Sequence, residues 1–413
     1  MKTDHNGQGG CRDTPRTSPP QSRKREKTFS SADGPLNPPP GKDKTNPMFT
    51  LPESPQPYTD KYFLRSRHVL DAEGLNPRVT MQVFFRDGPG KFAGIDEVVA
   101  LFRAFSPLAD HGGEILALPE GAPYAPLEPV LHISGPLTDF IELETLYLGI
   151  VSAATSLANG LPEPTTTEVA ARAAAIRALV PDVPLMYFGA RHWHWSREEA
   201  FCKAAVGAGF DSCATDAGAR AAGLSAGVGT IPHALVLTFA SKVGREHATR
   251  EATLAFDRHI EPACPRIALV DTFNHEVDDS LDTARGLGKR LDGVRLDTAG
   301  ECLGQGGMPS DGGEPYRTGT GVTIAGASAV RRALDEAGFP DVDIVLSSGF
   351  GNVEKVAAFA AARRKEPRLF ASLGIGGLFR SYAATADIVR VDGADLAKTG
   401  RAYHPNPRLI KKL

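Results

Sequence analysis

The chain has 413 residues, enough for about two domains and a large core. Its formal net charge is −3, with 46 basic and 49 acidic residues, so no overall field favours nucleic acid or an acidic membrane as a partner. The five cysteines are scattered without a CxxC pair, which argues against a zinc ribbon or a disulfide framework. No apolar run approaches the ~20 residues of a membrane span, and the N-terminus lacks a signal-peptide core. We therefore expect a cytoplasmic protein that binds neither nucleic acid nor membranes.

Residues 1–47 are rich in Pro, Gly, Ser, Lys and Arg and contain few large apolar side chains. Such a segment buries too little surface to offset the entropy lost on ordering, so we expect a disordered tail, and Met48 could be the true start. Residues 48–137 contain several short strands and one or two helices without regular alternation, which predicts a small α+β domain. The last residues, 385–413, are expected to return to this domain.

Residues 138–384 predict an irregular α/β (TIM-like) barrel domain. A long, mostly buried helix spanning about 133–159 leads into this domain. Seven apolar runs end in polar or glycine residues and mostly alternate with helices, and one of these expected strands covers 224–233. Ser196 to Glu199 is expected to open a helix as a capping box. We favour a barrel over a doubly wound sheet because polar residues end nearly every run instead of gathering at one switch point.

The most informative stretch runs from 266 to 301. Two apolar runs, Ile267–Val270 and Gly293–Leu296, flank an amphipathic helix with the spacing of a βαβ unit. Ligands bind at the carboxyl ends of parallel strands. Polar side chains occupy the ends of both runs: Asp271, Thr272, Asn274, Arg295, Asp297 and Thr298. A cation and several carboxylates there indicate a polyanionic substrate with a divalent metal.

Glycine-rich turns follow two later runs. Gly374 to Gly377 is expected to precede a short helix near Leu378, and its amides could bind a phosphate together with the Ser347-Ser348-Gly349 turn. Arg191, expected at the end of the FGAR strand, and Arg295 could bind phosphate or carboxylate bidentately. The glycine clusters could instead be simple tight turns, and the arginines could form structural salt bridges. Because two glycine turns and two arginines occur at strand ends, we favour phosphate binding.

Three of the eleven histidines are candidates for chemistry. His233, expected at a kinked strand end, could act as a base or phosphate acceptor, unless its ring only satisfies Asp216 or Asp271. His192 and His194 have the spacing of a metal pair, which also arises when polar residues alternate with buried tryptophans. One acid near the start of the second domain could also reach the site: Asp139, Glu142 or Glu144.

The motif order TDKYF, IELETLYLGI, FGAR, GTIPH, DTFN, DGVRLDT and LGIGG is similar to the nicotinate phosphoribosyltransferase family of type II phosphoribosyltransferases. The match runs from about residue 58 to the end, and FGxR, GTxxH and DGVRLD are fairly specific as a set. The resemblance implies transfer of the 5-phosphoribosyl group from PRPP to the ring nitrogen of nicotinate in NAD biosynthesis. The products would be nicotinate mononucleotide and pyrophosphate.

The resemblance also implies residue roles. Phe188 would stack on the pyridine, with Tyr62 of a neighbouring subunit in a homodimer closing the other side. Arg191 and Arg295 would hold pyrophosphate or the pyridine carboxylate. The other implied substrate contacts are Asp216, Thr230, Asn274, Ser347, Ser348, Gly349, Gly376 and Gly377.

For the reacting centre, the resemblance implies that Asp271 and Asp297 serve the ribose and Mg²⁺. His233 matches the histidine that family members phosphorylate with ATP. The chain departs from the family pattern at Pro232 and after His233 and Asp297. Asp216 stands where nicotinamide phosphoribosyltransferases carry an aspartate.

Several alternatives therefore stay open. Nicotinamide or quinolinate could be the base instead of nicotinate. A metal-dependent barrel hydrolase could bind zinc through His192, His194, His233 and an aspartate such as Asp297. A protein that binds phosphoribosyl ligands without turnover is a third possibility.

Overall fold

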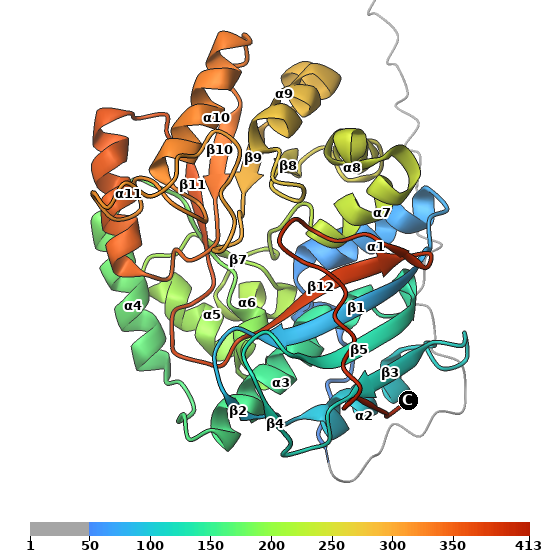
Figure 1. Ribbon diagram of the computed structural model, residues 1–413. Coiled ribbons are helices and arrows are strands. Elements are labelled where there is room, and N and C mark those ends of the chain that lie inside the picture. Colours follow the sequence, from blue (N-terminus) through green and yellow to red (C-terminus); the bar gives the residue numbers. More distant parts are fainter. Residues whose placement is uncertain (1–48) are drawn as a thin grey trace, which may run out of the picture. The chain divides into compact units, whose positions relative to one another are not determined.

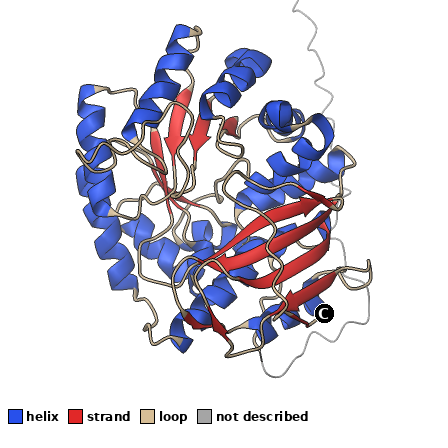
Figure 2. Ribbon diagram, in the orientation of Figure 1, coloured by secondary structure: helices blue, strands red, loops and turns tan. Residues whose placement is uncertain are grey.

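The computed structural model describes residues 49–413, all within one compact unit, Asp43–Leu413. The expected tail, residues 1–47, and Met48 lie outside the described residues. The described chain contains two six-stranded sheets with helices around them (Figures 1 and 2). A two-stranded sheet of β2 (Gly90–Lys91) and β4 (Pro123–Tyr124) completes the strands.

The first six-stranded sheet is antiparallel, with the order β13-β12-β1-β5-β3-β14. Its strands are β1 (Arg78–Phe85), β3 (Glu114–Ala117), β5 (Pro129–Pro136), β12 (Ala384–Val391), β13 (Ala394–Asp395) and β14 (Ile410–Lys411). β12 pairs along β1 from Val79 opposite Val391 to Phe85 opposite Ala384. The C-terminal segment thus lies in the same sheet as residues 78–136, and this pairing brings its side chains to the second sheet's edge.

Helices cover this sheet where their apolar faces can be buried. α1 (Lys61–Ala72) and α2 (Ile95–Phe105) are both amphipathic, and α2 buries the residues Val98, Val99, Leu101 and Phe102. The expected long helix is interrupted: two 3-10 turns, Leu137–Asp139 and Ile141–Leu143, precede α3 (Glu144–Ala158). The segment Ile141–Ala158 is long and apolar enough to cross a membrane by composition, yet 78% of it is buried inside the fold, as in a core helix.

The second six-stranded sheet is parallel, with the order β7-β6-β11-β10-β9-β8. Its strands are β6 (Leu185–Tyr187), β7 (Ser212–Cys213), β8 (Ile267–Leu269), β9 (Gly293–Leu296), β10 (Asp343–Leu346) and β11 (Ser372–Ile375). This order is the chain order written around a ring, because the last parallel strand, β11, pairs with the first, β6. The ring is open between β7 and β8. The predicted α/β class is confirmed, and the described arrangement is that of an open, irregular barrel.

The seventh strand expected over residues 224–233 does not form. The segment instead spans the open side of the ring: the amide of Val228 donates to Cys213 O at 2.8 Å, and Thr230 Oγ1 donates to Ile267 O at 2.9 Å. Pro232 has no amide to donate, and Gly229 adopts φ 147°, so the segment cannot complete a regular ladder. It serves as an irregular substitute for a strand.

Helices alternate with the parallel strands and pack outside them (Figure 2). They are α4 (Thr166–Leu179), α5 (Glu198–Gly207), α6 (Asp216–Ala221), α7 (His233–Val243), α8 (Arg245–His259), α9 (Glu276–Leu287), α10 (Ile324–Glu336) and α11 (Val353–Lys365). The capping box expected at Ser196 is wrong, because a 3-10 turn occupies Trp195–Arg197 and α5 begins without a side-chain cap. The carboxylate of Glu198 turns inward and accepts from Thr215 Oγ1 at 2.7 Å.

Gly149 of α3 allows the closest contact between that helix and the 3-10 turn Ala190–His192. A Cβ on Gly149 would lie 2.3 Å from Trp193 O, closer than real atoms approach. We expect Gly149→Ala to cost about 1–3 kcal/mol of stability, as overpacked cores do, and to move the turn that carries Arg191. Denaturant unfolding measures this cost. Gly207→Ala is the control, since a Cβ there meets no atom within 4 Å, and equal losses in the two variants would contradict the packing explanation.

Candidate active site

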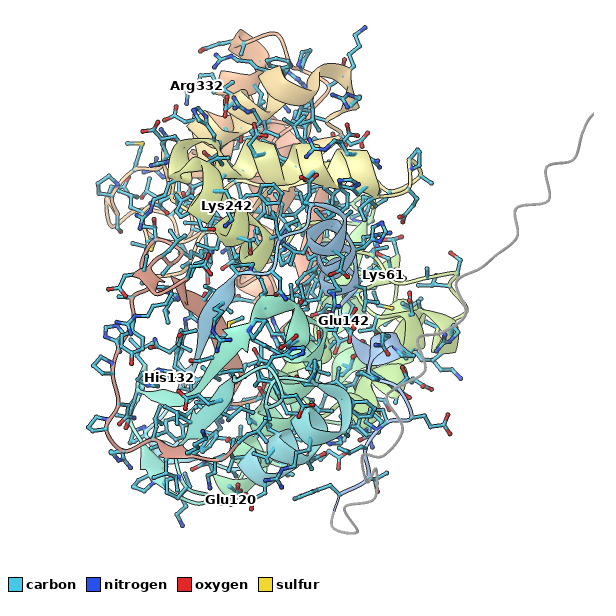
Figure 3. The ribbon with its side chains drawn as sticks, turned by 90° about the vertical axis from the view of Figure 1, so that its right-hand side faces the viewer. Lys61, Glu120, His132, Glu142, Lys242 and Arg332 are labelled. Carbon is cyan, nitrogen blue, oxygen red and sulfur yellow. The ribbon has the colours of Figure 1, made fainter. Side chains whose placement is uncertain are left out.

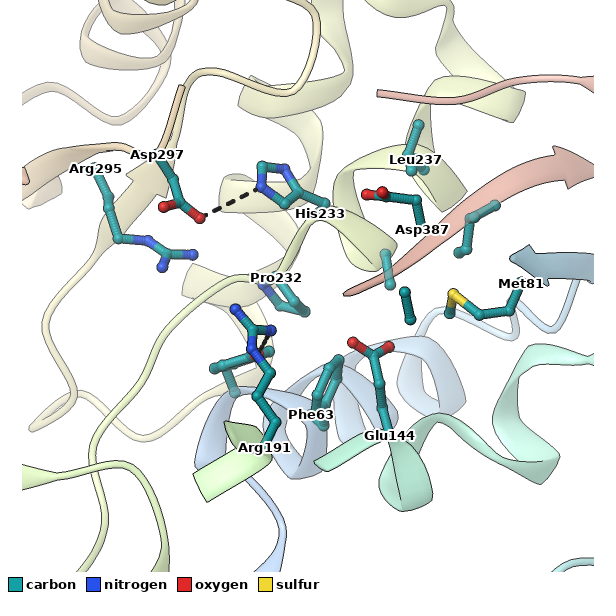
Figure 4. Close-up of a pocket in the computed structure, with 14 residues that line it drawn as sticks. Phe63, Met81, Glu144, Arg191, Pro232, His233, Leu237, Arg295, Asp297 and Asp387 are labelled. Carbon is teal, nitrogen blue, oxygen red and sulfur yellow. Dashed lines mark hydrogen bonds and ion pairs between the residues drawn. The ribbon is translucent and has the colours of Figure 1, made fainter. Parts of the chain in front are cut away.

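A cavity of about 570 Å³ lies between the carboxyl ends of the parallel strands and residues 383–387 at the start of β12. A smaller cavity of about 60 Å³ adjoins it and shares Arg191, His233, Arg295 and Asp297 (Figure 4). Ten residues nominated from the sequence line the larger cavity: Phe188, Arg191, His233, Arg295, Asp297, Ser347, Ser348, Gly349, Gly376 and Gly377. Residues on or just after β6, β9, β10 and β11, and at the start of α7, thus meet at one site although they lie far apart in the sequence.

The two arginines enter the cavity from different elements. Arg191 lies in the 3-10 turn Ala190–His192 and not at a strand end as expected, because β6 already ends at Tyr187. Its Nη1 donates to the Tyr62 hydroxyl at 3.1 Å. Arg295 is on β9, and its Nη2 donates to Ile231 O at 2.9 Å. Each guanidinium keeps further N–H groups available for an anion.

Asp297 follows β9 and is the ionised carboxylate of the cavity. Its Oδ1 accepts from Ser347 Oγ at 2.9 Å, and its Oδ2 lies 3.6 Å from His233 Nε2 (Figure 4). Burial opposes ionisation, but the positive charges of Arg295 and Lys398 hold the pKa of Asp297 well below its usual range. The carboxylate is therefore negative at neutral pH.

The two glycine turns form an anion-binding surface. The amide N–H groups of Ser348, Gly349, Gly376 and Gly377 donate to no acceptor among residues 49–413, although all four residues line the cavity. A Cβ on Gly351 would lie 2.1 Å from Gly377 O, so the two turns are in direct contact. The short helix expected at Leu378 is absent, since the Leu378 amide donates to Gly376 O in a tight turn. Four free amides without a helix can still bind a phosphate.

Phe188 packs on the backbone of the last parallel strand. A Cβ on Gly374 would lie 2.4 Å from Phe188 Cε2, so only glycine permits the ring to lie flat against β11. On the opposite side of Arg191, Tyr62 lines the smaller cavity. Tyr62 reaches this site from its own chain, so its contact with Arg191 does not require the neighbouring subunit that the resemblance implied.

His192 and His194 do not form a metal pair. His192 lines the cavity beside Gly376, and burial lowers its pKa to about 4. His194 instead binds Glu97 Oε1 through Nε2 at 2.8 Å. No group of three or more His, Cys, Asp or Glu residues that could hold a metal occurs within 49–413. The zinc hydrolase interpretation is therefore wrong for the described chain.

Asp271 does not face the cavity. It is 1% exposed, and its Oδ2 accepts from Lys398 Nζ. Because an ammonium group already neutralises Asp271, the pair Asp271 and Asp297 does not fit a resident Mg²⁺ held between the two carboxylates. The sequence also gave no reason to expect Lys398 here, since it lies 127 residues from Asp271 and reaches it only through the return of the C-terminal segment.

Three other nominated residues are also engaged elsewhere. Thr230 Oγ1 donates to the β8 backbone, and Asn274 Nδ2 donates to Leu303 O. Asp216 pairs with Lys61 Nζ at 2.7 Å and accepts from the Gly227 amide at 2.9 Å; Lys61 projects from α1 on the face shown in Figure 3. None of the three lines either cavity, so their expected substrate contacts are not found.

The sequence missed several charged residues of the lining. Lys398, Asp387 and Arg401 come from the C-terminal segment, and Arg401 Nε binds Asp387 Oδ2 at 2.7 Å. Glu144, one of three acids considered near the start of the second domain, lines the smaller cavity. The other two bind elsewhere: the Asp139 carboxylate pairs with His111, and the Glu142 carboxylate accepts from Gln56.

Comparisons with known proteins agree with this geometry. Residues 60–155 match the family model of the quinolinate phosphoribosyl transferase N-terminal domain. Nicotinate phosphoribosyltransferase pncB2 of Mycobacterium tuberculosis is 28% identical over 341 residues, which are 74% of this chain and 63% of that protein. Nicotinate phosphoribosyltransferase of Bacillus subtilis is 23% identical over 326 residues, 70% of this chain and 57% of that protein. The chain thus spans less than two thirds of the length of these curated relatives.

Solved structures share the fold. A putative nicotinate phosphoribosyltransferase from Saccharomyces cerevisiae has a TM-score of 0.64 at 16% identity, covering 85% of this chain and 93% of that one. The nicotinate phosphoribosyltransferase of Porphyromonas gingivalis has a TM-score of 0.61 at 14% identity, covering 84% and 93%. By sequence and fold together, the chain is similar to nicotinate phosphoribosyltransferases.

Proposed function

We propose that the protein transfers the 5-phosphoribosyl group of PRPP to the ring nitrogen of nicotinate. One observation carries this proposal: several guanidinium groups, among them those of Arg191 and Arg295, line a single cavity together with the ionised carboxylate of Asp297 and four free backbone amides. A sugar with phosphates at both ends matches that distribution, because amides and arginines bind the phosphates and the carboxylate faces the sugar between them.

The reaction needs no covalent nucleophile. The bond between ribose C1 and the pyrophosphate oxygen breaks, the pyridine nitrogen gives its lone pair to C1, and pyrophosphate leaves with the bonding pair. Positive charge develops on the ribose in the transition state, and Asp297 stabilises it. Negative charge develops on pyrophosphate, which Arg191 and Arg295 offset. Mg²⁺ enters this scheme as the counter-ion of the PRPP substrate.

Charge favours nicotinate over nicotinamide as the base. Arg86, Arg191, Arg295 and Arg401 all line the cavity, so cations remain for a pyridine carboxylate beside those that face pyrophosphate. Asp216, the residue that suggested nicotinamide, carries its own counter-ion in Lys61 and does not line the cavity, so it does not repel an acid there. The Phe188 ring offers a flat apolar surface for the pyridine.

Two further expectations belong to the same proposal. ATP could act as a co-substrate through phosphorylation of His233, and the protein could act as a homodimer. Analytical ultracentrifugation tests the dimer. Incubation with radiolabelled ATP, followed by alkaline gel analysis of phosphohistidine, tests the coupling.

The central experiment is a substrate comparison. The protein is incubated with PRPP and Mg²⁺, with nicotinate, nicotinamide or quinolinate, and with or without ATP, while mononucleotide is followed by chromatography. We expect nicotinate to be converted most efficiently. Efficient conversion of nicotinamide with little from nicotinate would overturn the assignment of the base, and no product from any of the three would overturn the activity.

A further inference from the structure

Lys398 is the most enclosed cation beside the cavity. Its side chain is 7% exposed and makes three contacts: Nζ binds Asp271 Oδ2, lies 3.0 Å from His233 Nε2, and donates to Asp297 O at 3.1 Å. The neighbouring backbone fixes it in place, because the Thr399 amide donates to Thr272 O at 2.9 Å. The side-chain contacts of Lys398 and the backbone bond of Thr399 therefore both hold the ammonium group beside His233.

The N–H donors of Lys398 determine which ring nitrogen of His233 carries the proton. A lysine ammonium has three N–H donors and no acceptor, and each donor here has one acceptor. His233 Nε2 must therefore accept, which leaves it without a proton. The ring proton is on Nδ1, which lies 3.1 Å from Thr272 Oγ1 and donates to it. Burial and the Lys398 charge lower the pKa of His233, consistent with a neutral ring.

The opposite tautomer would change Asp297. Nε2 lies 3.6 Å from Asp297 Oδ2 and 3.8 Å from Asp271 Oδ2, both longer than a hydrogen bond. A proton on Nε2 would turn the ring into a donor toward these carboxylates. Asp297 Oδ2 would then be occupied, although it has no other hydrogen-bond partner among the described residues.

We propose that Lys398 is a positioning residue that fixes His233 as the neutral Nδ1–H tautomer and so keeps Asp297 Oδ2 free to face the ribose. The structural part of this inference stands on the contacts alone, and its catalytic part rests on the proposed phosphoribosyl transfer.

Nitrogen-15 NMR of protein labelled at the histidine rings tests the tautomer without turnover. The His233 signals are assigned by their loss in His233→Gln. We expect the wild-type protein and Lys398→Arg to carry the proton on Nδ1, and Lys398→Met to carry it on Nε2. A wild-type ring protonated on Nε2, or an unchanged tautomer in Lys398→Met, would overturn the proposal.

Kinetics test the catalytic part separately. We expect Lys398→Met to lower kcat by ~10-fold or more, as loss of a group that orients a reacting residue does, with little change in KM for PRPP. Lys398→Arg should recover most of the rate. Lys242→Met is the matched control, because Lys242 is an exposed lysine at the far end of α7, the helix that begins with His233 (Figure 3). A tautomer change in Lys398→Met without loss of kcat would contradict the catalytic role of Lys398 alone. An inactive wild-type protein would contradict the proposed function but would not affect the NMR result.

Discussion

Asp297→Asn is expected to lower kcat/KM for phosphoribosyl transfer by at least ~100-fold, the scale of losing one aligned electrostatic group. Asparagine keeps the shape of the side chain and can still accept from Ser347 Oγ, so the loss reports the negative charge. That charge is stable in the wild type, because the positive charges of Arg295 and Lys398 depress the pKa of Asp297. The measurement is initial rates with PRPP and nicotinate.

The control for Asp297→Asn is Asp343→Asn. Asp343 opens β10, the neighbouring strand, at the end away from the cavity, and its side chain is exposed. We expect unchanged rates and an unchanged melting temperature from this control. A turnover near the wild-type value in Asp297→Asn would remove this carboxylate from the mechanism, whatever the family resemblance.

The parallel strands could be predicted from sequence because their signals are local. The run Gly293–Leu296 is β9 with the predicted bounds, and the run at 267 gives β8 with the expected helix between them. A buried parallel strand is a short apolar run that ends in polar residues, and the carboxyl ends of such strands meet. That rule alone placed Arg295, Asp297, Ser347 and the glycine turns at one cavity.

The site residues that could not be predicted from the sequence share a different feature. Lys398 and Asp387 reach the site through the pairing of β12 with β1, a contact between segments about 300 residues apart. No periodicity near Lys398 encodes that contact. Asp271 was misplaced for the same reason, because its partner was unknown. The wrong prediction of a strand at 224–233 has a local cause instead. The apolar pattern suggested a strand, although the Gly and Pro residues of this segment prevent a regular ladder of hydrogen bonds.

Glu144 forms no ion pair within 4 Å and no side-chain hydrogen bond within 49–413, and its burial has a large predicted effect on stability. It begins α3, is 6% exposed, and its carboxyl points into the smaller cavity (Figure 4). Burial raises its pKa from 4.5 to about 8, against a partial opposing effect of Arg191. Between those two pH values the folded protein holds a proton that the unfolded chain has released. Stability from this group is therefore complete below pH 4.5 and is lost as the pH rises toward 8.

Glu144→Gln removes this pH dependence, because an amide of the same shape does not ionise. We expect the variant to be more stable than the wild type at pH 8 by up to about 4 kcal/mol, and nearly equal to it at pH 5. Denaturant unfolding of both proteins at the two pH values measures the difference. Glu142→Gln is the control, since the Glu142 carboxylate binds Gln56 at the surface, two residues away. An equal effect of Glu144→Gln at both pH values would show that Glu144 is ionised in the folded protein, and the smaller cavity would then hold a carboxylate anion instead of a carboxylic acid.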